Sequence, residues 1–190
     1  MRKLLLLMHT SLDGFVAGPN GEMDWIIVSD ELFDMAHERT NESDTALYGR
    51  VTYQMMESYW PTAGDEPNAS KHDIEHSTWY NNVRKAVISR TMKDANIPNT
   101  KIISENVAEE VKRLKQETGK NIVILGSPSA VHILTAENLI DEYWLCVNPI
   151  LLGEGIPLFK NSKNVTKLNL VSTKVFSSGV VCLQYSVKRV

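Results

Sequence analysis

The sequence predicts a three-layer α/β/α sandwich with a mostly parallel central sheet and an antiparallel C-terminal hairpin. Short apolar runs alternate with helical patterns along most of the 190 residues, which is typical of a parallel sheet covered on both faces. Near the C-terminus two apolar runs, 168–176 and 180–187, are joined across Ser177-Ser178-Gly179. This pattern indicates a hairpin at one edge of the sheet.

The elements follow from runs of apolar residues and from the residues that interrupt them. The first run, 4–8, stops at His9, too early for a signal peptide, and is typical of a buried strand. Val107, Val111 and Leu114 recur at helical spacing among Glu and Lys, which predicts a surface helix with one core face. We expect strands near 2–9, 45–48, 84–89, 101–103, 121–125, 140–148, 168–176 and 180–187. We expect helices near 30–39, 50–57, 70–82, 106–117 and 128–137, and an exposed loop at 61–70, which is rich in Pro, Gly, Asn and Asp.

Length and composition predict a single domain over residues 1–190. With 43% hydrophobic residues the chain can bury a substantial core, and no linker divides it. A net charge of −3 and a pI near 6.0 argue against nucleic-acid binding. No segment approaches the length of a membrane span, so we expect a cytoplasmic protein. Cys146 and Cys182 lie in apolar strand patterns, where buried free thiols are usual.

One strand, turn and helix in the second half of the chain suits an anion. The run 122–125 ends in Gly126-Ser127-Pro128-Ser129, and Pro128 is well placed near the first helical position. A strand that opens a helix through such a turn gathers free backbone N–H groups and the positive end of the helix dipole. The turn is neither a Walker A loop nor a G-x-G-x-x-G fingerprint. The same arrangement is also common as a plain connection, so phosphate binding and a structural turn both remain open.

Two other predicted strands end in polar turns of the same kind. Strand 45–48 runs into Gly49-Arg50, with Thr52 in the first turn of the next helix. Strand 84–89 runs into Ser89-Arg90-Thr91, which brings two hydroxyls and a guanidinium together. A guanidinium suits a phosphate group, although an arginine at a helix start is often only solvated. In the loop 149–159, Gly153 and Gly155 flank Glu154 and allow the backbone to turn sharply. This loop is a candidate wall of a binding site.

These motifs together resemble the dihydrofolate reductase superfamily. The resemblance is closest to the C-terminal reductase domain of the bifunctional riboflavin-biosynthesis deaminase/reductase and its stand-alone bacterial relatives. It rests on motifs in the same order over almost the whole chain, namely Thr10-Ser11-Leu12-Asp13-Gly14-Phe15-Val16-Ala17, Leu47-Tyr48-Gly49-Arg50-Val51-Thr52-Tyr53, Val87-Ile88-Ser89-Arg90-Thr91, Leu125-Gly126-Ser127, Leu139-Ile140-Asp141-Glu142 and 149–159.

The resemblance implies an NADPH-dependent oxidoreductase, similar to 5-amino-6-(5-phosphoribosylamino)uracil reductase, that transfers hydride to a small heterocycle or ribosylamino-pyrimidine. It also implies a homodimer. The cofactor cleft would be formed by the three polar turns, and Arg50 and Arg90 favour NADPH over NADH. The implied cofactor-binding residues are Gly49, Arg50, Thr52, Ser89, Arg90, Gly126, Ser127, Ser129 and Ala130. The chain departs from the dihydrofolate reductases at Gly126-Ser127, where those enzymes have a Gly-Gly pair.

The substrate half of the site is less defined by the sequence. Dihydrofolate reductases place a carboxylate early in the first long helix, where this chain has Phe33, so true dihydrofolate reduction is not expected. In the riboflavin-type reductases the loop after the first strand contributes, and Asp13 is the candidate catalytic residue. Asp13 could equally cap its Asp-Gly turn. The substrate-binding residues implied by the resemblance are Asp13, Trp25, Phe33, Leu152, Gly153 and Gly155.

The sequence supports neither a metal site nor two other common kinds of catalytic site. His72 and His76 have the i, i+4 spacing of a zinc pair, but no third ligand follows at a fitting distance, so no metal site is predicted. A Gly-x-Ser-x-Gly elbow and a Pro-Cys-x-x-Cys deaminase motif are absent from the sequence. The alternative from another class is a non-catalytic NADP(H)- or nucleotide-binding module, which the missing acid and the altered Gly-Gly pair would both fit.

Overall fold

The computed structural model describes residues 1–92, 97–160 and 165–189. Eight strands form one sheet in the order β5-β4-β3-β6-β1-β7-β10-β9, and two short strands pair separately. The strands are β1 (Leu4–Thr10), β2 (Phe15–Ala17), β3 (Ser43–Gly49), β4 (Arg84–Ile88), β5 (Thr100–Ile103), β6 (Asn121–Leu125), β7 (Glu142–Val147), β8 (Ile156–Pro157), β9 (Leu168–Val175) and β10 (Val181–Val187). The helices are α1 (Asp30–Asn41), α2 (Arg50–Glu57), α3 (Trp60–Ala63), α4 (Lys71–Asn82), α5 (Val107–Gln116) and α6 (Pro128–Ala136).

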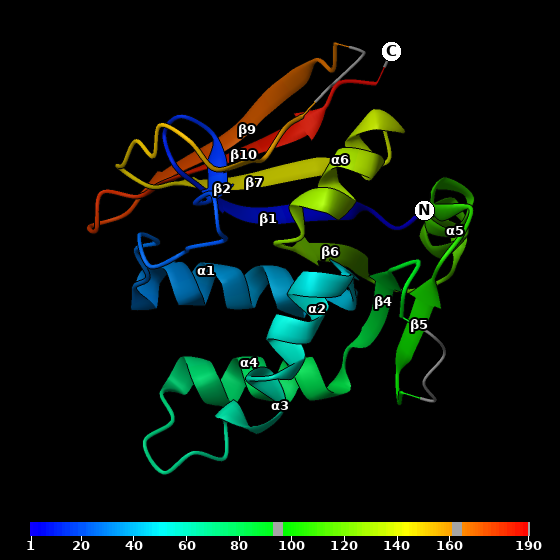
Figure 1. Cartoon of the computed structure of the whole chain (residues 1–190), viewed down its shortest axis with the longest axis horizontal. Helices are drawn as coiled ribbons and strands as arrows, with labels where there is room; N and C mark the ends of the chain where they lie inside the picture. The colour runs from blue at the N-terminus through cyan, green and yellow to red at the C-terminus, as the bar shows by residue number, and fades with distance from the viewer. Residues whose placement is uncertain (93–96, 161–164, 190) are drawn as a thin grey trace.

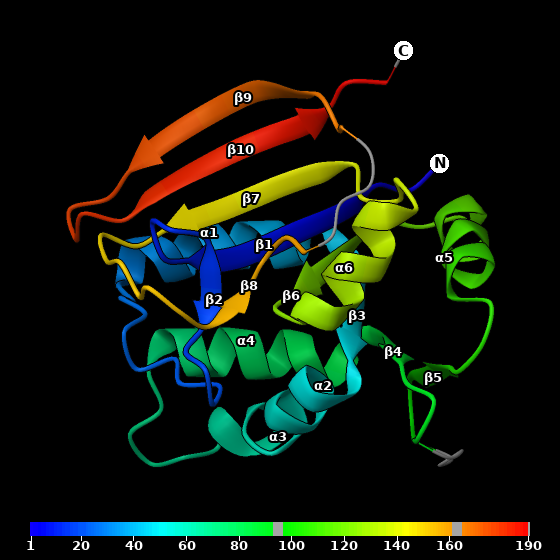
Figure 2. The same cartoon turned by 45° about the horizontal axis from the view of Figure 1, so that its top comes forward.

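The predicted fold class is confirmed. From β5 to β7 each strand pairs in parallel with its neighbour, and β10 runs antiparallel to both β7 and β9. The pair β9–β10 forms one end of the sheet, far from α3 and α4 (Figures 1 and 2). Within the described residues, no helix is long and apolar enough to cross a membrane.

Alternation along the central strands divides the core into two layers. On β1, Leu4 and Leu6 pack in the layer that contains the apolar face of α6, whereas Leu7 packs with Leu32 and Met35 of α1. Side chains on successive strand residues point to opposite faces, so an almost continuous apolar run serves both layers. The third layer therefore exists because both faces of the sheet are apolar.

Most expected elements are present, with ends shifted by a few residues. The predicted loop at 61–70 is partly wrong, because its first residues belong to the four-residue helix α3 with Pro61 in the first turn. The two-stranded β2–β8 pair was not predicted. It has three and two residues, too few to show a strand period in the sequence.

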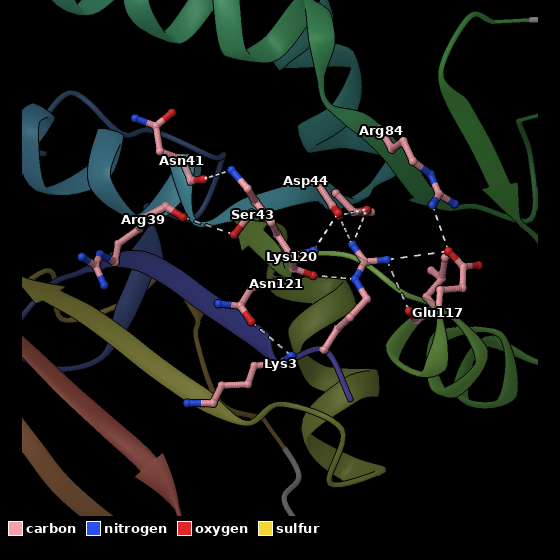
Figure 3. Close-up of polar contacts among 12 residues, drawn as sticks. Lys3, Arg39, Asn41, Ser43, Asp44, Arg84, Glu117, Lys120 and Asn121 are labelled. Atoms are coloured by element: carbon pink, nitrogen blue, oxygen red, sulfur yellow. Dashed lines mark hydrogen bonds and ion pairs between the residues drawn. The ribbon is translucent and has the colours of Figure 1, made fainter.

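The amino-terminal ends of the strands are closed by a cluster around the buried guanidinium of Arg2. Its Nε donates to the carbonyl of Lys120 at 2.6 Å and its Nη2 to Thr45 Oγ1 at 2.6 Å. The guanidinium also pairs with Asp44 and lies 3.7 Å from Glu117 Oε2. Figure 3 shows Asp44 of β3, Glu117 just after α5 and Lys120 just before β6 around this guanidinium. Ion pairs and hydrogen bonds therefore occupy the amino-terminal ends of the strands. A ligand site is to be sought at their carboxyl ends.

Candidate functional site

A cavity of about 610 Å³ opens at the carboxyl ends of β1, β3 and β6. Loops and helix starts gather at this edge because the strands are parallel, and in α/β sheets it is the edge where ligands bind. The cavity is lined by Leu7, Met8, His9, Val16, Ala17, Gly21, Met23, Ile26, Val28, Leu32, Phe33, Met35, Ala36, Gly49, Val51, Thr52, Met55, Met56, Trp60, His72, His76, Leu125, Gly126, Ser127, Pro128, Ser129, His132, Cys146 and Ile156.

Two of the predicted polar turns meet at one end of this cavity. β3 and β6 are hydrogen-bonded neighbours, so Gly49 and Gly126-Ser127 lie side by side. The Ser127 hydroxyl accepts a hydrogen bond of 2.9 Å from the backbone N–H of Gly49. Gly126 and Ser127 both have left-handed backbones, with φ of 67° and 65°. Ser127 stands where the dihydrofolate reductases have the second glycine of a Gly-Gly pair. Its side chain therefore connects the two turns by a hydrogen bond.

The two turns pack closely against the helices that follow them. A Cβ on Gly49 would lie 3.1 Å from Ser129 Oγ, and one on Gly126 would lie 3.2 Å from Thr52 Cγ2, so glycine at both positions allows this close packing. The helices α2 and α6 both begin here, and their first backbone N–H groups have no partner within the helix. Two helix N-termini beside glycine turns suit the pyrophosphate of a dinucleotide.

The third predicted turn lies beside a second cavity, of about 800 Å³, on the other side of α6. Arg90 lines it, together with Ile133 of α6 and the start of α5. Glu105, Glu109 and Glu137 also line this space. Arg90 is therefore the cation of a groove that also contains three carboxylates.

Three of the predicted cofactor-binding residues, Ser89, Ala130 and Arg50, lie outside the lining of both cavities. The Ser89 hydroxyl is buried and accepts hydrogen bonds from the N–H groups of Thr91 and Met92, at 3.2 and 2.9 Å, which is a turn-forming role. Ala130 is 1% exposed and packs in the core, so only its backbone can reach a ligand. Arg50 is exposed, and its Nη1 donates to Gln54 Oε1 at 2.9 Å.

Asp13, the candidate catalytic residue, connects two loops outside the cavity. Its carboxylate accepts hydrogen bonds from Ser11 Oγ at 2.6 Å and from the backbone N–H groups of Leu152 and Gly153 at 3.2 and 2.8 Å. The Ser11 hydroxyl, followed by the Gly153 N–H, lowers the pKa of Asp13 below its ordinary value. The geometry thus supports the structural reading of Asp13.

The other predicted substrate residues divide into two groups. Phe33 lines the cavity, whereas Trp25, Leu152, Gly153 and Gly155 do not. The indole N–H of Trp25 donates to the Glu22 carbonyl at 3.0 Å. A Cβ on Gly155 would lie 2.2 Å from the Ala17 carbonyl oxygen, so this glycine permits the close β2–β8 pairing. Of the predicted substrate residues other than Asp13, only Phe33 therefore lies in the cavity wall.

His72 and His76 form part of an aromatic wall. The His72 ring is stacked on Phe33, with centroids 3.7 Å apart, and the His76 ring lies 4.1 Å from Trp60. In the described part of the chain no group of three or more His, Cys, Asp or Glu residues could hold a metal ion. His72 and His76 therefore line the cavity together with Phe33 and Trp60.

Sequence reasoning missed several lining residues that share the same edge of the sheet. His9 ends an apolar run on β1, and the rule that ligands bind at the carboxyl ends of parallel strands would have identified it. Burial lowers the pKa of His9 to about 4, so its ring is neutral near pH 7. On α6, His132 Nε2 lies 3.0 Å from the carbonyl oxygen of Pro157. The buried amide of Asn148 contacts His9 Nδ1 at 3.3 Å and accepts a hydrogen bond from the Ile27 N–H.

Comparisons with known proteins agree with this geometry. The RibD C-terminal domain family matches residues 2–182. In Bacillus subtilis (strain 168), the uncharacterized protein YyaP is 37% identical over 97% of this chain and 94% of its own length. A crystal structure from Shewanella sp. PV-4, named for riboflavin biosynthesis, superposes with a TM-score of 0.73 at 22% identity and covers 98% of this chain and 99% of that one.

A solved bifunctional protein has the same fold over part of its length. It is the diaminohydroxyphosphoribosylaminopyrimidine deaminase/5-amino-6-(5-phosphoribosylamino)uracil reductase of Thermotoga maritima. The TM-score is 0.68 at 15% identity, over 98% of this chain and 57% of that protein. At such identities, the two solved structures support the fold.

Proposed function

The chain belongs to the RibD C-terminal domain family, and from this premise we propose that it is an NADPH-dependent reductase. The acceptor would be a small heterocycle or ribosylamino-pyrimidine. The observation that carries the proposal is the junction of Gly49 with Gly126-Ser127 at one end of the 610 Å³ cavity. There the N-termini of α2 and α6 begin beside the cavity, and helix N-termini suit a pyrophosphate.

In this proposal the residues of the chain position the cofactor and exclude water. The N–H groups at the starts of α2 and α6 and the exposed hydroxyl of Ser129 would hold the pyrophosphate. Arg50 and Arg90 are the candidate partners of a ribose phosphate. A bound nicotinamide would supply the hydride, and the apolar walls of the cavity would keep solvent away from the reacting atoms.

A non-catalytic NADP(H)- or nucleotide-binding module is the second candidate. It is favoured by one observation: among the described residues, no Asp or Glu lines the cavity, so no carboxylic acid is available there as a proton donor. Steady consumption of NADPH with any acceptor would exclude this candidate. Cofactor binding without turnover, across a broad panel of heterocycles, would favour it.

The test is a titration of the purified protein with NADPH and NADH, followed by tryptophan fluorescence and melting temperature. At a hundredfold excess over the dissociation constant, a ligand of the native state adds about 2.7 kcal/mol, which raises the melting temperature by about 5–10 °C for this length. Arg50→Ala and Arg90→Ala should weaken NADPH binding. Arg84→Ala is the matched control, because Arg84 begins β4 at the opposite edge of the sheet.

The outcomes separate the parts of the proposal. An equal response to NADPH and NADH would remove the preference for the phosphorylated cofactor, and the glutamates around Arg90 would explain it. Loss of binding in Arg84→Ala as well would indicate a general effect of charge. No response to either cofactor would overturn the reductase proposal.

We also propose that the protein is a cytoplasmic homodimer. β9 is exposed along its whole length at the end of the sheet. Among the described residues, no strand pairs with its outer edge, which leaves this edge and its apolar side chains available to a second copy. Cys146 and Cys182 are cross-strand neighbours and remain free thiols, which agrees with a reducing compartment.

A further inference from the structure

Cys146 and Cys182 lie opposite one another in the antiparallel part of the sheet. Cys146 is on β7 and Cys182 is on β10, and the register pairs them directly. Both are free thiols, and the proposed function gives neither of them a role. Two thiols at facing strand positions form a pair that an oxidant can join.

The hydrogen-bond pattern of β7 and β10 brings the two cysteines close together. Val187 donates its N–H to the carbonyl of Asp141, so these two residues form a hydrogen-bonded pair on the same two strands. Hydrogen-bonded and non-hydrogen-bonded pairs alternate along antiparallel strands, and Cys182 lies an odd number of positions before Val187. The cysteines are therefore a non-hydrogen-bonded pair. In such pairs the Cα atoms lie about 4.5 Å apart, and a disulfide spans about 4.4–6.8 Å between Cα atoms.

Two cationic side chains lie near Cys182 on this face of the sheet. Lys174 of β9 is its direct partner on the side away from Cys146. Arg39 of α1 lies over the Trp144 ring, 4.6 Å from the ring centre, beside the same pair of strands. The neighbouring thiol, followed by these two charges, lowers the pKa of Cys182 below its ordinary value, against the opposing effect of burial. These surroundings favour the thiolate of Cys182.

The two thiols differ in their access to solvent. Cys182 is 3% exposed and lies beside the exposed Lys174, whereas Cys146 is 0% exposed. The neighbouring Cys182, together with burial, raises the pKa of Cys146 above its ordinary value. Cys182 is therefore the nucleophile of the pair, and Cys146 is the thiol that reacts second. With so little of its surface exposed, Cys182 is open only to a small, uncharged oxidant.

We propose that Cys182 and Cys146 are a modification site at which hydrogen peroxide forms a cross-strand disulfide. The Cys182 thiolate attacks one peroxide oxygen, so an S–O bond forms and the O–O bond breaks, and the released hydroxide takes the proton lost by Cys182 and leaves as water. Cys146 then attacks the sulfur of this sulfenic acid, so the S–S bond forms and the S–O bond breaks, and hydroxide leaves as water with the Cys146 proton. The two thiols lose two electrons and two protons, and one peroxide becomes two waters.

The disulfide has consequences for the sheet edge and for the cavity. The chain between the two cysteines includes β8 and β9, and also Leu152 and Gly153, whose N–H groups donate to Asp13. A cross-link over a long segment stabilises the folded state mainly by restricting the unfolded chain. Cys146 also lines the 610 Å³ cavity, so its oxidation changes one wall of that cavity. The inference goes beyond the proposed reductase activity and does not depend on it.

The experiment treats the folded wild-type protein with hydrogen peroxide, removes the excess with catalase, and blocks the remaining thiols in denaturant before mass spectrometry. We expect a single chain that has lost the mass of two hydrogen atoms, and a peptide map that joins Cys146 to Cys182. Dithiothreitol should restore both thiols. The oxidised protein should melt about 5–10 °C higher than the reduced protein.

Variants test the order of the two steps. Cys146→Ser should stop at the sulfenic acid of Cys182, which dimedone added with the denaturant traps, whereas Cys182→Ser should leave Cys146 unreacted. Lys174→Gln should slow the loss of thiols by about threefold or more, because half a pKa unit changes the thiolate fraction by that factor. Lys112→Gln is the matched control and should react as the wild type does, because Lys112 pairs with Glu109 on α5.

Three results would overturn the inference. The first is a folded wild-type protein that keeps both thiols in a large excess of peroxide, and the second is disulfides that form only between chains. The third is Cys146 reacting as fast in Cys182→Ser as in the wild type. Circular dichroism checks that each variant is folded, and if a serine variant is not, the wild-type mass and peptide map still decide. None of these results bears on NADPH binding, so failure of this inference and failure of the reductase proposal are distinguishable.

Discussion

At the residue scale, the cavity contains buried histidines whose neutrality couples stability to pH. Burial holds the pKa of His9 at about 4 and that of His76 at about 3, against an ordinary value of 6.5. Below that ordinary value the unfolded chain binds more protons than the folded one, so stability falls as the pH falls toward 4. At pH 5 each histidine should lower the free energy of unfolding by about 2 kcal/mol.

Urea unfolding at pH 7.5 and pH 5 measures this effect. His9→Asn should remove about half of the loss between the two pH values, and the double variant His9→Asn, His76→Phe should remove most of it. A wild-type midpoint that does not change between pH 7.5 and pH 5 would contradict the burial of neutral rings.

Ser127 illustrates how one side chain serves both the backbone and the site. Its hydroxyl satisfies the Gly49 N–H, but its left-handed backbone is strained for a residue with a Cβ. Ser127→Ala should lower the free energy of unfolding by about 1–2 kcal/mol, because the hydrogen bond is lost and the strain remains. Ser127→Gly should cost less than about 1 kcal/mol, because glycine relieves the strain. Urea midpoints of the two variants test this order, and equal losses would show that the strain is unimportant.

At the element scale, the amino-terminal edge of the sheet depends on the Arg2 cluster shown in Figure 3. The Arg2 side chain is 2% exposed and joins the start of β1 to β3, α5 and β6. Arg2→Met should lower the free energy of unfolding by about 1.5–3 kcal/mol, because the Lys120 carbonyl and the Thr45 hydroxyl would lose a charged hydrogen-bond donor. Lys3→Met is the matched control: the Lys3 side chain is 58% exposed and pairs with Glu142, so its loss should cost about 0–1 kcal/mol. Thermal unfolding distinguishes the two, and similar melting temperatures would contradict the structural role of Arg2.

The sequence predicted the elements whose signals are local. The long strands and helices appear as apolar runs and helical spacing, and the turns at Gly49 and Gly126-Ser127 lie where strand ends placed them. By contrast, the two-residue β8 forms only because Gly155 allows close approach to Ala17, a contact between segments far apart in the chain. No local pattern encodes such a pairing.

The same distinction applies to the site. Asp13 is a candidate for catalysis by its resemblance to the Ser-Leu-Asp-Gly position of the riboflavin-type reductases. Its three hydrogen bonds reach Ser11 and the 152–153 segment, and spacing in the sequence cannot reveal the contacts with that segment. In the sequence, His76 is visible only as half of an i, i+4 histidine pair with His72. Its contacts with Trp60 and its place in the cavity wall depend on how α4 packs against α3.

At the scale of the whole molecule, the exposed β9 edge predicts association. Leu170, Val171 and Val175 are more than half exposed on this strand. If two copies pair there, the wild-type protein should have a mass about twice 21.4 kDa by light scattering. The double variant Leu170→Lys, Val171→Lys should be monomeric and folded, because charged residues block pairing of edge strands. A wild-type monomer, or a variant that remains dimeric, would contradict this interface.

In the proposed function a nicotinamide dinucleotide binds between the turns of β3 and β6. The ligand should then cover the N–H groups at the starts of α2 and α6, which hydrogen–deuterium exchange with and without saturating NADPH measures. We expect slower exchange in peptides covering residues 47–53 and 125–132, with no change in residues 168–175. Unchanged exchange in both turns, or protection confined to another part of the chain, would contradict it.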